Sequence, residues 1–317
     1  NASRDDIFQL MVTLDRRFMA GLAYFLGLRK LGAGIVRVGP GNPELQFDTI
    51  RRTGANKLVT IPSFLLKLIS YAEENGIDYK SFGIEAAVCI GEPIRDKDLN
   101  LNKLGEKIKS KWDIKLYNTY ASTEMGASFT ECDEGVGGHL VPEILIVEFL
   151  DENDKPVKDG ELGEVTITNI GVEGMPLVRF KTGDMCYHYT EPCRCGRSSL
   201  RVGPIIGRKN QMLKYKGTTL FPQSLYDNLV EIPGVKNYLI EVSTNSIDTD
   251  EILVRIGSDD KRPEFVKYIK DHFRAKLRVA PEVELMDPAE VEKLQFGPMS
   301  RKAVTFIDKR KGHGTSQ

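Results

Sequence analysis

The sequence predicts an α/β protein in which a parallel sheet and an antiparallel β section are followed by a small α+β domain. In the first 130 residues, helix-like and strand-like segments alternate, which implies parallel strands joined by crossover connections. From about residue 140, alternating strands are joined by Pro-, Gly- and Asp-rich connections, which favour antiparallel structure. A chain of 317 residues exceeds the usual size of a single core, so we expect two domains, 1–206 and 207–317.

The apolar pattern of the first part specifies individual elements. Pro62 and Ser63 begin a helix with an apolar face, and Gly76 ends it. The apolar run at 85–90 ends in Gly-Glu-Pro and suits a buried parallel strand. A polar helix at 99–111 then leads into a second strand that ends at a polar turn. Because ligands bind at the carboxyl ends of parallel strands, these two turns are candidate site segments.

The second part is expected to be mostly β-structure. Residues 143–170 form two alternating strands, and a further strand from residue 175 runs into a Thr-Gly-Asp turn. In the small domain, the segment 263–277 is an amphipathic helix whose apolar face carries Phe265, Ile269 and Phe273. We expect strands near 238–243, 251–257 and 283–286, and a frayed basic tail from 309 onwards.

Composition narrows the class of protein. The 44 basic and 45 acidic residues nearly cancel, which argues against nucleic-acid or membrane partners. No apolar run approaches about 18 residues and no signal-peptide pattern is found. Five cysteines in a large neutral chain favour a reduced, cytoplasmic protein over a disulfide scaffold. We expect small-molecule partners, and the sequence leaves a homodimer open.

Five short motifs are weak one by one, but their order and spacing are specific. They are CIGEP (89–93), YNTYASTEMG (117–126), RFKTGD (179–184), GRKNQMLKYKGTTLFP (207–222) and SRKAV (300–304). Over essentially its whole length the chain resembles the phenylacetate–coenzyme A ligases, a group of adenylate-forming enzymes. The resemblance implies that residues 1–206 are the AMP-binding part of a large domain and that 207–317 are its small mobile partner.

The resemblance implies a two-step, AMP-forming reaction that makes a carbon–sulfur bond. ATP and an aryl, phenylacetate-like carboxylate give an acyl-adenylate and pyrophosphate, and the thiol of coenzyme A then displaces AMP. Two alternatives remain open: an adenylating enzyme with an acceptor other than coenzyme A, or a nucleotide- or coenzyme A-binding chain without turnover. The charged run Asp15, Arg16 and Arg17 favours a more polar acid than phenylacetate, because buried charges near a phenyl ring are costly.

One family feature is missing from the sequence. The family has a Ser/Thr/Gly-rich phosphate-binding loop upstream of the first motif, and the nearest glycine-rich stretch here lacks the hydroxyl side chains. We therefore expect the chain to start partway into the large domain.

The phosphate-facing roles fall on the Ser-Thr-Glu segment. The resemblance implies that Thr123 offers its hydroxyl to the α-phosphate and that Glu124 holds Mg²⁺ against the ATP phosphates, which suits a hard oxygen ligand. The alternative is a helix cap, since Ser or Thr followed by Glu often begins a helix.

The nucleoside-facing roles fall on three segments. The resemblance implies an adenine-facing turn formed by Gly91, Glu92 and Pro93, and an opposite wall formed by Asn118, Thr119 and Tyr120. It also implies an acyl pocket bordered by Tyr120 and Ala121, and a ribose contact from Asp184, whose carboxylate accepts hydrogen bonds from a diol. The alternatives are plain sheet core for the strand and a simple Gly turn for Asp184.

The remaining roles fall on the small domain. The resemblance implies that Arg208 contacts the ribose or a phosphate, that Asn210 replaces a hinge aspartate, and that Lys216 and Gly217 lie near the coenzyme A tunnel. Lys302 matches the lysine that reaches the carboxylate and α-phosphate during adenylation, where its charge stabilises the transition state. The alternative for Lys302 is a solvated surface residue.

Two loops supply a possible metal site. Cys132 and His139 follow one polar run, and Cys193 and Cys195 lie in a second loop. Together they offer the Cys₃His donor set of a structural zinc site, in loops with little apolar content. Unrelated free thiols and a nucleophilic Cys132 are the alternatives, although no charge-relay partner is evident for the latter. Cys186 is a substitute ligand, whereas Cys89 fits an apolar core strand.

Overall fold

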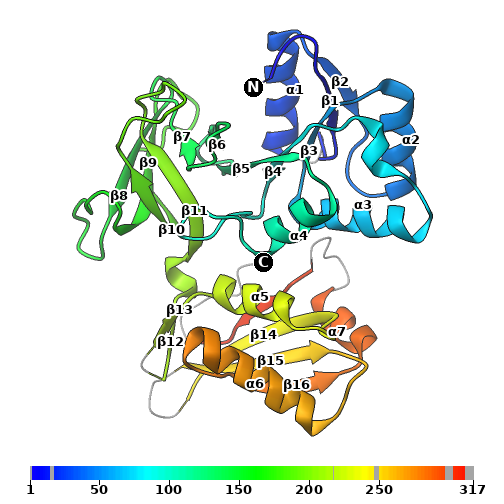
Figure 1. Cartoon of the computed structure of the whole chain (residues 1–317). Coiled ribbons are helices and arrows are strands. Elements are labelled where there is room, and N and C mark those ends of the chain that lie inside the picture. Colours follow the sequence, from blue (N-terminus) through cyan, green and yellow to red (C-terminus); the bar gives the residue numbers. More distant parts are fainter. Residues whose placement is uncertain (1, 15–17, 217, 246–249, 297–302, 311–317) are drawn as a thin grey trace. The chain divides into compact units, whose positions relative to one another are not determined.

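The structure is a computed structural model, and its chain divides into two compact units, Asn1–Ile206 and Gly207–Gln317 (Figure 1). The structure describes residues 2–14, 18–216, 218–245, 250–296 and 303–310.

The larger unit is built on one sheet, to which its described residues contribute eleven strands in the order β2-β1-β3-β4-β5-β6-β7-β11-β10-β9-β8. The first five strands in this order are parallel, as the sequence predicts. They are β2 (Gly34–Arg37), β1 (Ile7–Leu10), β3 (Lys57–Thr60), β4 (Ala86–Ile90) and β5 (Lys115–Ala121). The helices that connect them are α1 (Met19–Leu31), α2 (Pro43–Thr53), α3 (Pro62–Glu74) and α4 (Lys103–Lys111), with a 3₁₀ turn η1 (Tyr79–Phe82).

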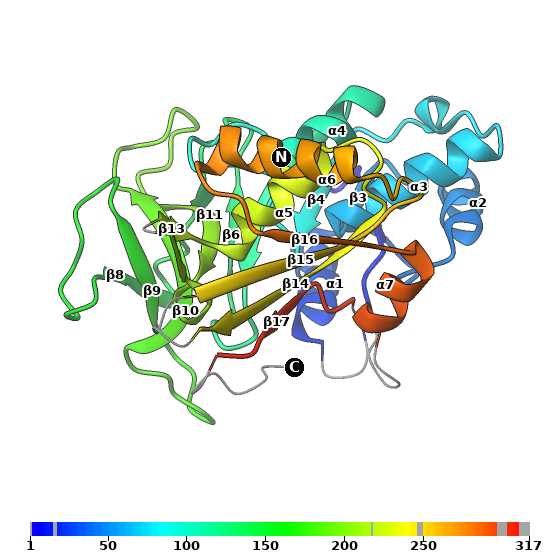
Figure 2. The same ribbon diagram turned by 90° about the horizontal axis from the view of Figure 1, so that it is seen from below.

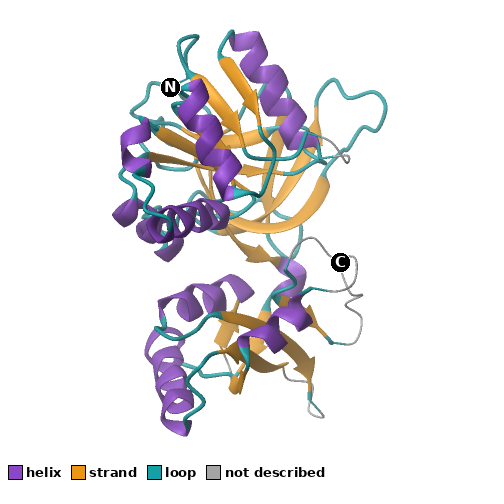
Figure 3. Cartoon of the chain, turned by 90° about the vertical axis from the view of Figure 1, so that its right-hand side faces the viewer, coloured by secondary structure: helices purple, strands orange, loops and turns teal. Residues whose placement is uncertain are grey.

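Alternate side chains of the parallel strands enter two separate cores, so both faces of this half are covered. Leu58 and Cys89 pack in a cluster with α2, α3 and α4, whereas Val59 and Ile90 pack with Leu28 of α1 on the other face. Figure 3 shows helices lying against strands in this way. The continuous apolar strands of a parallel sheet follow from this double burial.

Helix α3 agrees with its sequence pattern, but α4 begins later than predicted. The side chain of Asn102 accepts a hydrogen bond from the backbone N of Gly105 (3.0 Å) and caps α4. Leu99 lies before this cap with a left-handed backbone (φ 66°), and Leu101 forms an isolated bridge with Arg95. The residues from 99 to 102 are therefore a loop, and the predicted start at 99 is wrong.

The second half of the sheet is antiparallel, as the sequence predicts. Its strands are β6 (Ser128–Glu131), β7 (Gly138–His139), β8 (Leu145–Leu150), β9 (Leu162–Asn169), β10 (Phe180–Tyr189) and β11 (Arg201–Arg208). The predicted end of a strand at Thr-Gly-Asp is wrong, because β10 continues through it. The register of β10 against β9 shifts between Lys181 and Met185, and Gly183 (φ 78°) supplies the left-handed backbone that this bulge needs.

The smaller unit is an α+β structure. Its four-stranded sheet has the order β16-β15-β14-β17, with β14 and β15 antiparallel and the outer strands parallel to their neighbours (Figure 2). The strands are β14 (Asn237–Thr244), β15 (Asp250–Gly257), β16 (Glu282–Met286) and β17 (Phe306–Asp308). The other elements are η2 (Lys209–Gln211), the hairpin β12 (Leu213–Tyr215) and β13 (Thr218–Leu220), and the helices α5 (Pro222–Glu231), α6 (Pro263–Leu277) and α7 (Pro288–Gln295).

Helix α6 spans the predicted residues 263–277, and Phe265, Ile269 and Phe273 are buried as predicted. The expected frayed tail from residue 309 onwards is wrong for its first residues, because Arg310 is anchored. Arg310 is largely buried and pairs with Asp250 (3.2 Å) and Asp308 (2.6 Å).

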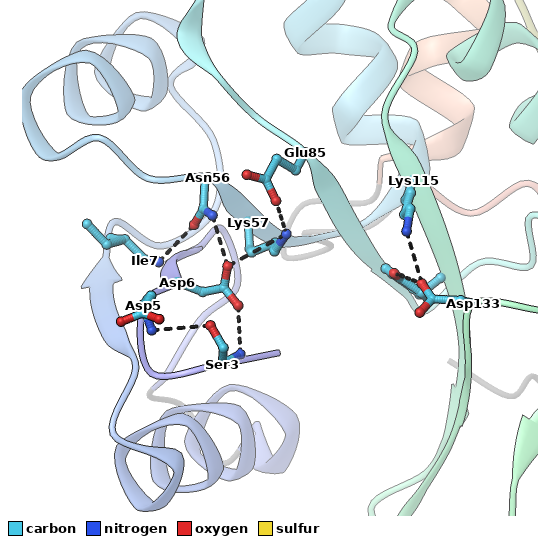
Figure 4. Close-up of polar contacts among 10 residues, drawn as sticks. Ser3, Asp5, Asp6, Ile7, Asn56, Lys57, Glu85, Lys115 and Asp133 are labelled. Carbon is cyan, nitrogen blue, oxygen red and sulfur yellow. Dashed lines mark hydrogen bonds and ion pairs between the residues drawn. The ribbon is translucent and has the colours of Figure 1, made fainter. Parts of the chain in front are cut away.

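A polar cluster secures the beginning of β1 (Figure 4). The carboxylate of Asp6 accepts hydrogen bonds from the backbone N of Ser3 (2.7 Å) and the side chain of Asn56 (2.9 Å), and Lys57 lies 3.6 Å away. Asn56 in turn accepts from the backbone N of Ile7 (2.8 Å). Burial alone raises the pKa of Asp6, but the hydrogen bonds from Asn56 and Ser3 and the charge of Lys57 outweigh it, and the net pKa is lowered.

Replacing Asp6 by Asn should make the stability of the protein less sensitive to acid. Because the folded-state pKa of Asp6 is depressed, its contribution is complete above its unfolded pKa of about 4 and is lost as the pH falls through the folded value. Denaturant unfolding at neutral and acidic pH should show a smaller acid-induced loss for Asp6→Asn than for the unchanged chain. Exposed Asp5→Asn is the control, and an equal loss for all three proteins would contradict the assignment.

Two helical glycines should respond oppositely to Ala. A Cβ at Gly105 would meet the carbonyl O of Ile94 at 2.6 Å, so Gly105→Ala should destabilise the fold by about 1–3 kcal/mol. Nothing lies within 4 Å of a Cβ at exposed Gly27 in α1, where Ala should stabilise by roughly 0.5–1 kcal/mol. Thermal unfolding measures both changes. A Gly105→Ala variant as stable as Gly27→Ala would show that α4 does not pack on Ile94 this closely.

Candidate functional site

The turn after β4 is held by the strand and helix that follow it in the sequence. The carbonyl O of Pro93 accepts a hydrogen bond from the side chain of Asn102 (2.9 Å), and the backbone N of Ile94 donates to the side chain of Asn118 (3.1 Å). Gly91 has a left-handed backbone (φ 79°), which a tight turn at this point requires. The Gly-Glu-Pro segment is thus fixed against β5.

Glu92 has a contact that sequence reasoning missed. Its carboxylate accepts hydrogen bonds from the backbone N (2.9 Å) and the hydroxyl (2.8 Å) of Ser63, in the first turn of α3. An anion at this position satisfies a helix N–H that lacks an intrahelical partner and complements the helix dipole. Glu92 therefore joins the turn to α3.

β5 carries three of the predicted site residues in succession. Asn118 is buried, and its backbone N donates to Glu131 of β6 (3.0 Å). The hydroxyl of Thr119, also buried, donates to Thr130 of β6 (3.3 Å), so this side chain makes a cross-strand contact within the sheet.

Tyr120 brings β5 into contact with a distant motif. Its hydroxyl donates a hydrogen bond to the carboxylate of Asp184 (2.8 Å), and its ring stacks on Phe129 with centroids 5.8 Å apart. Burial and the charge of Asp184 raise the pKa of Tyr120, which strengthens the preference for the protonated hydroxyl that donates to Asp184. The β10 bulge presents Asp184, whose backbone N donates to the hydroxyl of Thr182 (3.1 Å).

The Ser-Thr-Glu segment forms a turn between β5 and β6, so the helix-cap alternative is wrong. Met125 is buried beneath the turn, whereas Thr123 and Glu124 are exposed. Asn169 of β9, another residue that the sequence did not indicate, donates to the carbonyl O atoms of Met125 (2.7 Å) and Glu124 (3.2 Å). Exposed Ala121 precedes the turn at the end of β5.

The carboxylate of Glu124 is compatible with Mg²⁺. Mg²⁺ is usually bound through one or two carboxylates together with substrate phosphates, and it keeps some of its water. An exposed carboxylate on a turn whose backbone is held by Asn169 meets this need without further protein ligands.

The remaining predicted residues belong to the smaller unit. Arg208 is exposed at the end of β11, and exposed Asn210 lies in η2. Lys216 has a left-handed backbone (φ 49°), and its ammonium lies 4.8 Å from the ring centroid of Tyr215. Gly217 and Lys302 lie outside the described residues.

The predicted Cys–His set converges. The ligand atoms of Cys132, His139, Cys193 and Cys195 all lie within 4.8 Å of one another. Fully buried Cys186 is not part of this group. Burial, with the charges of Arg197 and Arg201, lowers the pKa of His139 and favours a neutral imidazole.

The thiols of this group differ in their acidity. Burial raises the pKa of Cys132 to about 11, which disfavours the thiolate that a nucleophilic role would need. The backbone N–H of Arg197 helps to lower the pKa of Cys195 to about 7.

Among the described residues, no helix is long and apolar enough to cross a membrane. Polar turns at the carboxyl ends of β4 and β5, with a side chain of β5 hydrogen-bonded to a carboxylate of β10, are typical of a nucleotide-binding α/β protein. The chain belongs to the AMP-binding enzyme family: residues 2–174 match its family description. Residues 217–310 match the AMP-binding enzyme C-terminal domain.

The relatives agree with the predicted resemblance to the phenylacetate–coenzyme A ligases, which is confirmed. The chain is 28% identical over 246 residues to the phenylacetate-coenzyme A ligase of Thermus thermophilus, covering 76% of this chain and 54% of that protein. It is 25% identical over 310 residues to that of Aromatoleum evansii, covering 92% and 67% respectively. The chain thus spans roughly half to two thirds of these relatives.

The fold also matches a solved structure. A 2-hydroxyisobutyryl-CoA ligase in the postadenylation state, in complex with R3-HIB-AMP, superposes with a TM-score of 0.78 at 20% identity. The match covers 96% of this chain and 66% of that one. It confirms the predicted fold class.

Proposed function

We propose that this chain is the nucleotide-binding and mobile portion of an AMP-forming acid–thiol ligase. The reaction joins an aryl, phenylacetate-like carboxylate to coenzyme A. The carboxylate oxygen attacks the α-phosphorus of ATP and pyrophosphate leaves; the coenzyme A sulfur then attacks the acyl carbon and AMP leaves. The observation that carries this proposal is the hydrogen-bonded convergence of three separate motif segments, 91–94, 118–120 and 182–184.

The roles of the nucleoside-facing residues follow from their surroundings. Gly91, Glu92 and Pro93 form a turn whose position is fixed by contacts to α3, α4 and β5, so it offers a rigid edge to a purine. Asp184 accepts from the ribose hydroxyls while Tyr120 holds the carboxylate in place. Asn118 acts as a positioning residue, because its side chain holds the backbone of Ile94.

The phosphates are assigned to the exposed turn. Thr123 donates its hydroxyl to the α-phosphate, and Glu124 holds Mg²⁺. When bound, Mg²⁺ neutralises charge on the phosphates and makes pyrophosphate a better leaving group.

The remaining residues are proposed to contact the acyl group and coenzyme A. Tyr120 and Ala121 border the acyl pocket, and the Tyr120 ring, stacked on Phe129, offers an aromatic wall. Names of relatives support an aryl acid. Arg208, Lys216 and Gly217 are assigned to the nucleotide and coenzyme A, and Asn210 to the hinge. Lys302 is assigned the role of stabilising the negative charge that develops in the transition state of adenylation.

Pyrophosphate release should separate the proposed function from its alternatives. The protein containing this chain is assayed with a panel of aryl and alkyl acids, with and without coenzyme A. Aryl acids should give pyrophosphate, and coenzyme A should convert the adenylate into a thioester. Adenylate without thioester would identify a different acceptor, and AMP binding without turnover would leave a binding chain. Either result would overturn the ligase proposal.

Replacing Lys302 should damage one half-reaction. Because one preorganised charge in a transition state is worth about 10²–10³ in rate, Lys302→Ala should slow adenylation by about that factor. Thioester formation from a supplied acyl-adenylate should be nearly unchanged. Exposed Lys293→Ala of α7 is the matched control and should affect neither step. Equal loss of both half-reactions in Lys302→Ala would refute the assigned role.

The ribose assignment makes a separate prediction. Asp184→Ala should weaken AMP binding by about tenfold to a hundredfold, because a charge-assisted hydrogen bond is lost. The same variant should bind 2′,3′-dideoxy-AMP nearly as well as the unchanged protein does, since that nucleotide lacks both hydroxyls. Titration calorimetry measures both affinities, with exposed Glu143→Gln as the control. A similar loss for the two nucleotides would show that Asp184 acts on the fold and not on the ribose.

A further inference from the structure

Four potential metal ligands from two distant loops meet beside β6 and β7. Cys132 follows β6, His139 belongs to β7, and Cys193 and Cys195 lie between β10 and β11. The proposed ligase reaction uses none of them. We propose that these four side chains bind one Zn²⁺ in a closed, structural Cys₃His site.

The distances between the ligand atoms fit tetrahedral zinc. Bonds of about 2.3 Å to sulfur and about 2.0 Å to nitrogen, at tetrahedral angles, separate two sulfurs by about 3.8 Å and a sulfur from a nitrogen by about 3.5 Å. The sulfurs of Cys132 and Cys193 are 3.7 Å apart. The sulfur of Cys195 is 3.5 Å from Nε2 of His139. The set therefore has room for zinc with little movement.

The donor set and its surroundings also favour zinc. Three soft sulfurs and an imidazole fill all four positions, which leaves none for a reacting molecule and defines a structural site. Nδ1 of His139 lies 3.3 Å from the hydroxyl of Ser199, which orients the ring with Nε2 towards the sulfurs. A Zn²⁺ with three thiolates carries one net negative charge, and the guanidinium of Arg197, 3.5 Å from the Cys195 sulfur, offsets it.

The backbone of the second loop is shaped to present its two cysteines. The backbone N of Gly196 donates to the carbonyl O of Cys193 (3.0 Å), and the backbone N of Cys193 donates to Arg197 (2.9 Å). Gly196 has a left-handed backbone (φ 91°), which allows a tight turn immediately after Cys195. The two sulfurs are thus directed to the same side.

The metal would hold together the loop after β6 and the loop before β11. Arg201 already bridges the two loops, since it donates to the carbonyl O atoms of Val136 (2.6 Å) and Glu191 (3.1 Å). Asp133, the residue after Cys132, accepts a hydrogen bond from Tyr117 (2.5 Å) and pairs with Lys115 (3.3 Å). Both partners are in β5 (Figure 4). Zinc would therefore tie the loop after β6, which already contacts β5 through Asp133, to the loop before β11.

Metal content and coordination test the proposal directly. Protein purified without added metal should contain about one zinc per chain. X-ray absorption should give three sulfur neighbours at about 2.3 Å and one nitrogen at about 2.0 Å. Replacement by Co²⁺ should produce the visible absorption of a tetrahedral thiolate site. Zinc well below one per chain, or a shell of oxygen and nitrogen without sulfur, would overturn the proposal.

Variants separate this site from adventitious binding. Cys195→Ser removes an exposed ligand and should lose zinc to a chromogenic chelator under conditions in which the unchanged protein retains it. Ser199→Ala should keep the ligands but weaken zinc binding by about 10- to 100-fold, as loss of a group that orients a ligand does. Buried Cys89→Ala removes a thiol outside the group and should retain zinc.

A stability measurement decides the structural role. A chelator should lower the thermal midpoint of the unchanged protein and of Cys89→Ala, but should have little effect on Cys195→Ser. Hydrogen exchange should then rise in β6, β7 and the loop before β11. An equal chelator effect on Cys195→Ser, or full zinc in that variant, would refute the assignment of the site.

Discussion

A buried carboxylate, that of Glu131, ties together the segments on which the larger unit's site is built. Its side chain is 1% exposed and accepts hydrogen bonds from Nε of Arg95 (2.6 Å) and from the backbone N of Asn118 (3.0 Å). Burial raises the pKa of Glu131, whereas Arg95 and the backbone donors oppose this. Leaving a buried charge unpaired costs about 3–5 kcal/mol. Glu131 of β6 is therefore stable in the fold only when β5 and the loop after β4 pack against it.

This ion pair also constrains the loop that holds Cys132 and His139. Arg95 donates to the carbonyl O of Leu99 (3.0 Å) as well as to Glu131, so its guanidinium is fixed between two segments. A Cβ at Gly135 would meet that guanidinium at 2.3 Å, and Gly135 has a left-handed backbone (φ 64°). The left-handed backbone and this close approach both favour glycine where the loop crosses Arg95. The loop after Cys132 and the segment after the Gly-Glu-Pro turn therefore meet at the same arginine.

The parts that sequence predicts well are those set by local pattern. Helix α6 is predicted by the helical spacing of apolar residues, which places Phe265, Ile269 and Phe273 on one face. The parallel strands are predicted by apolar runs that end in polar turns. The four zinc-type ligands were also visible, because residue type alone marks them. Their convergence could not be derived from spacing, since it depends on β7 pairing with β11.

The supporting contacts could not be predicted because they depend on pairings across long sequence separations. Glu131 and Arg95 are 36 residues apart, and a single buried carboxylate in a strand looks like any solvated one. The bulge that presents Asp184 is invisible in a Thr-Gly-Asp motif that is common in turns. Asn102 is an exception: an Asn directly before a helical run is a cap signal, and it would have corrected the start of α4.

The anchoring of Arg310 restricts where the hinge proposed at Asn210 can turn. The Arg310 guanidinium donates to the carbonyl O atoms of Asn210 (3.0 Å) and Met212 (2.9 Å) while it pairs with Asp250 and Asp308. These contacts all lie within the smaller unit. A pivot at or beyond the Asn210 carbonyl would break hydrogen bonds to a largely buried guanidinium, whereas rotation about the bonds before Asn210 would leave them intact. A hinge that preserves the smaller unit therefore has to turn on the N-terminal side of Asn210.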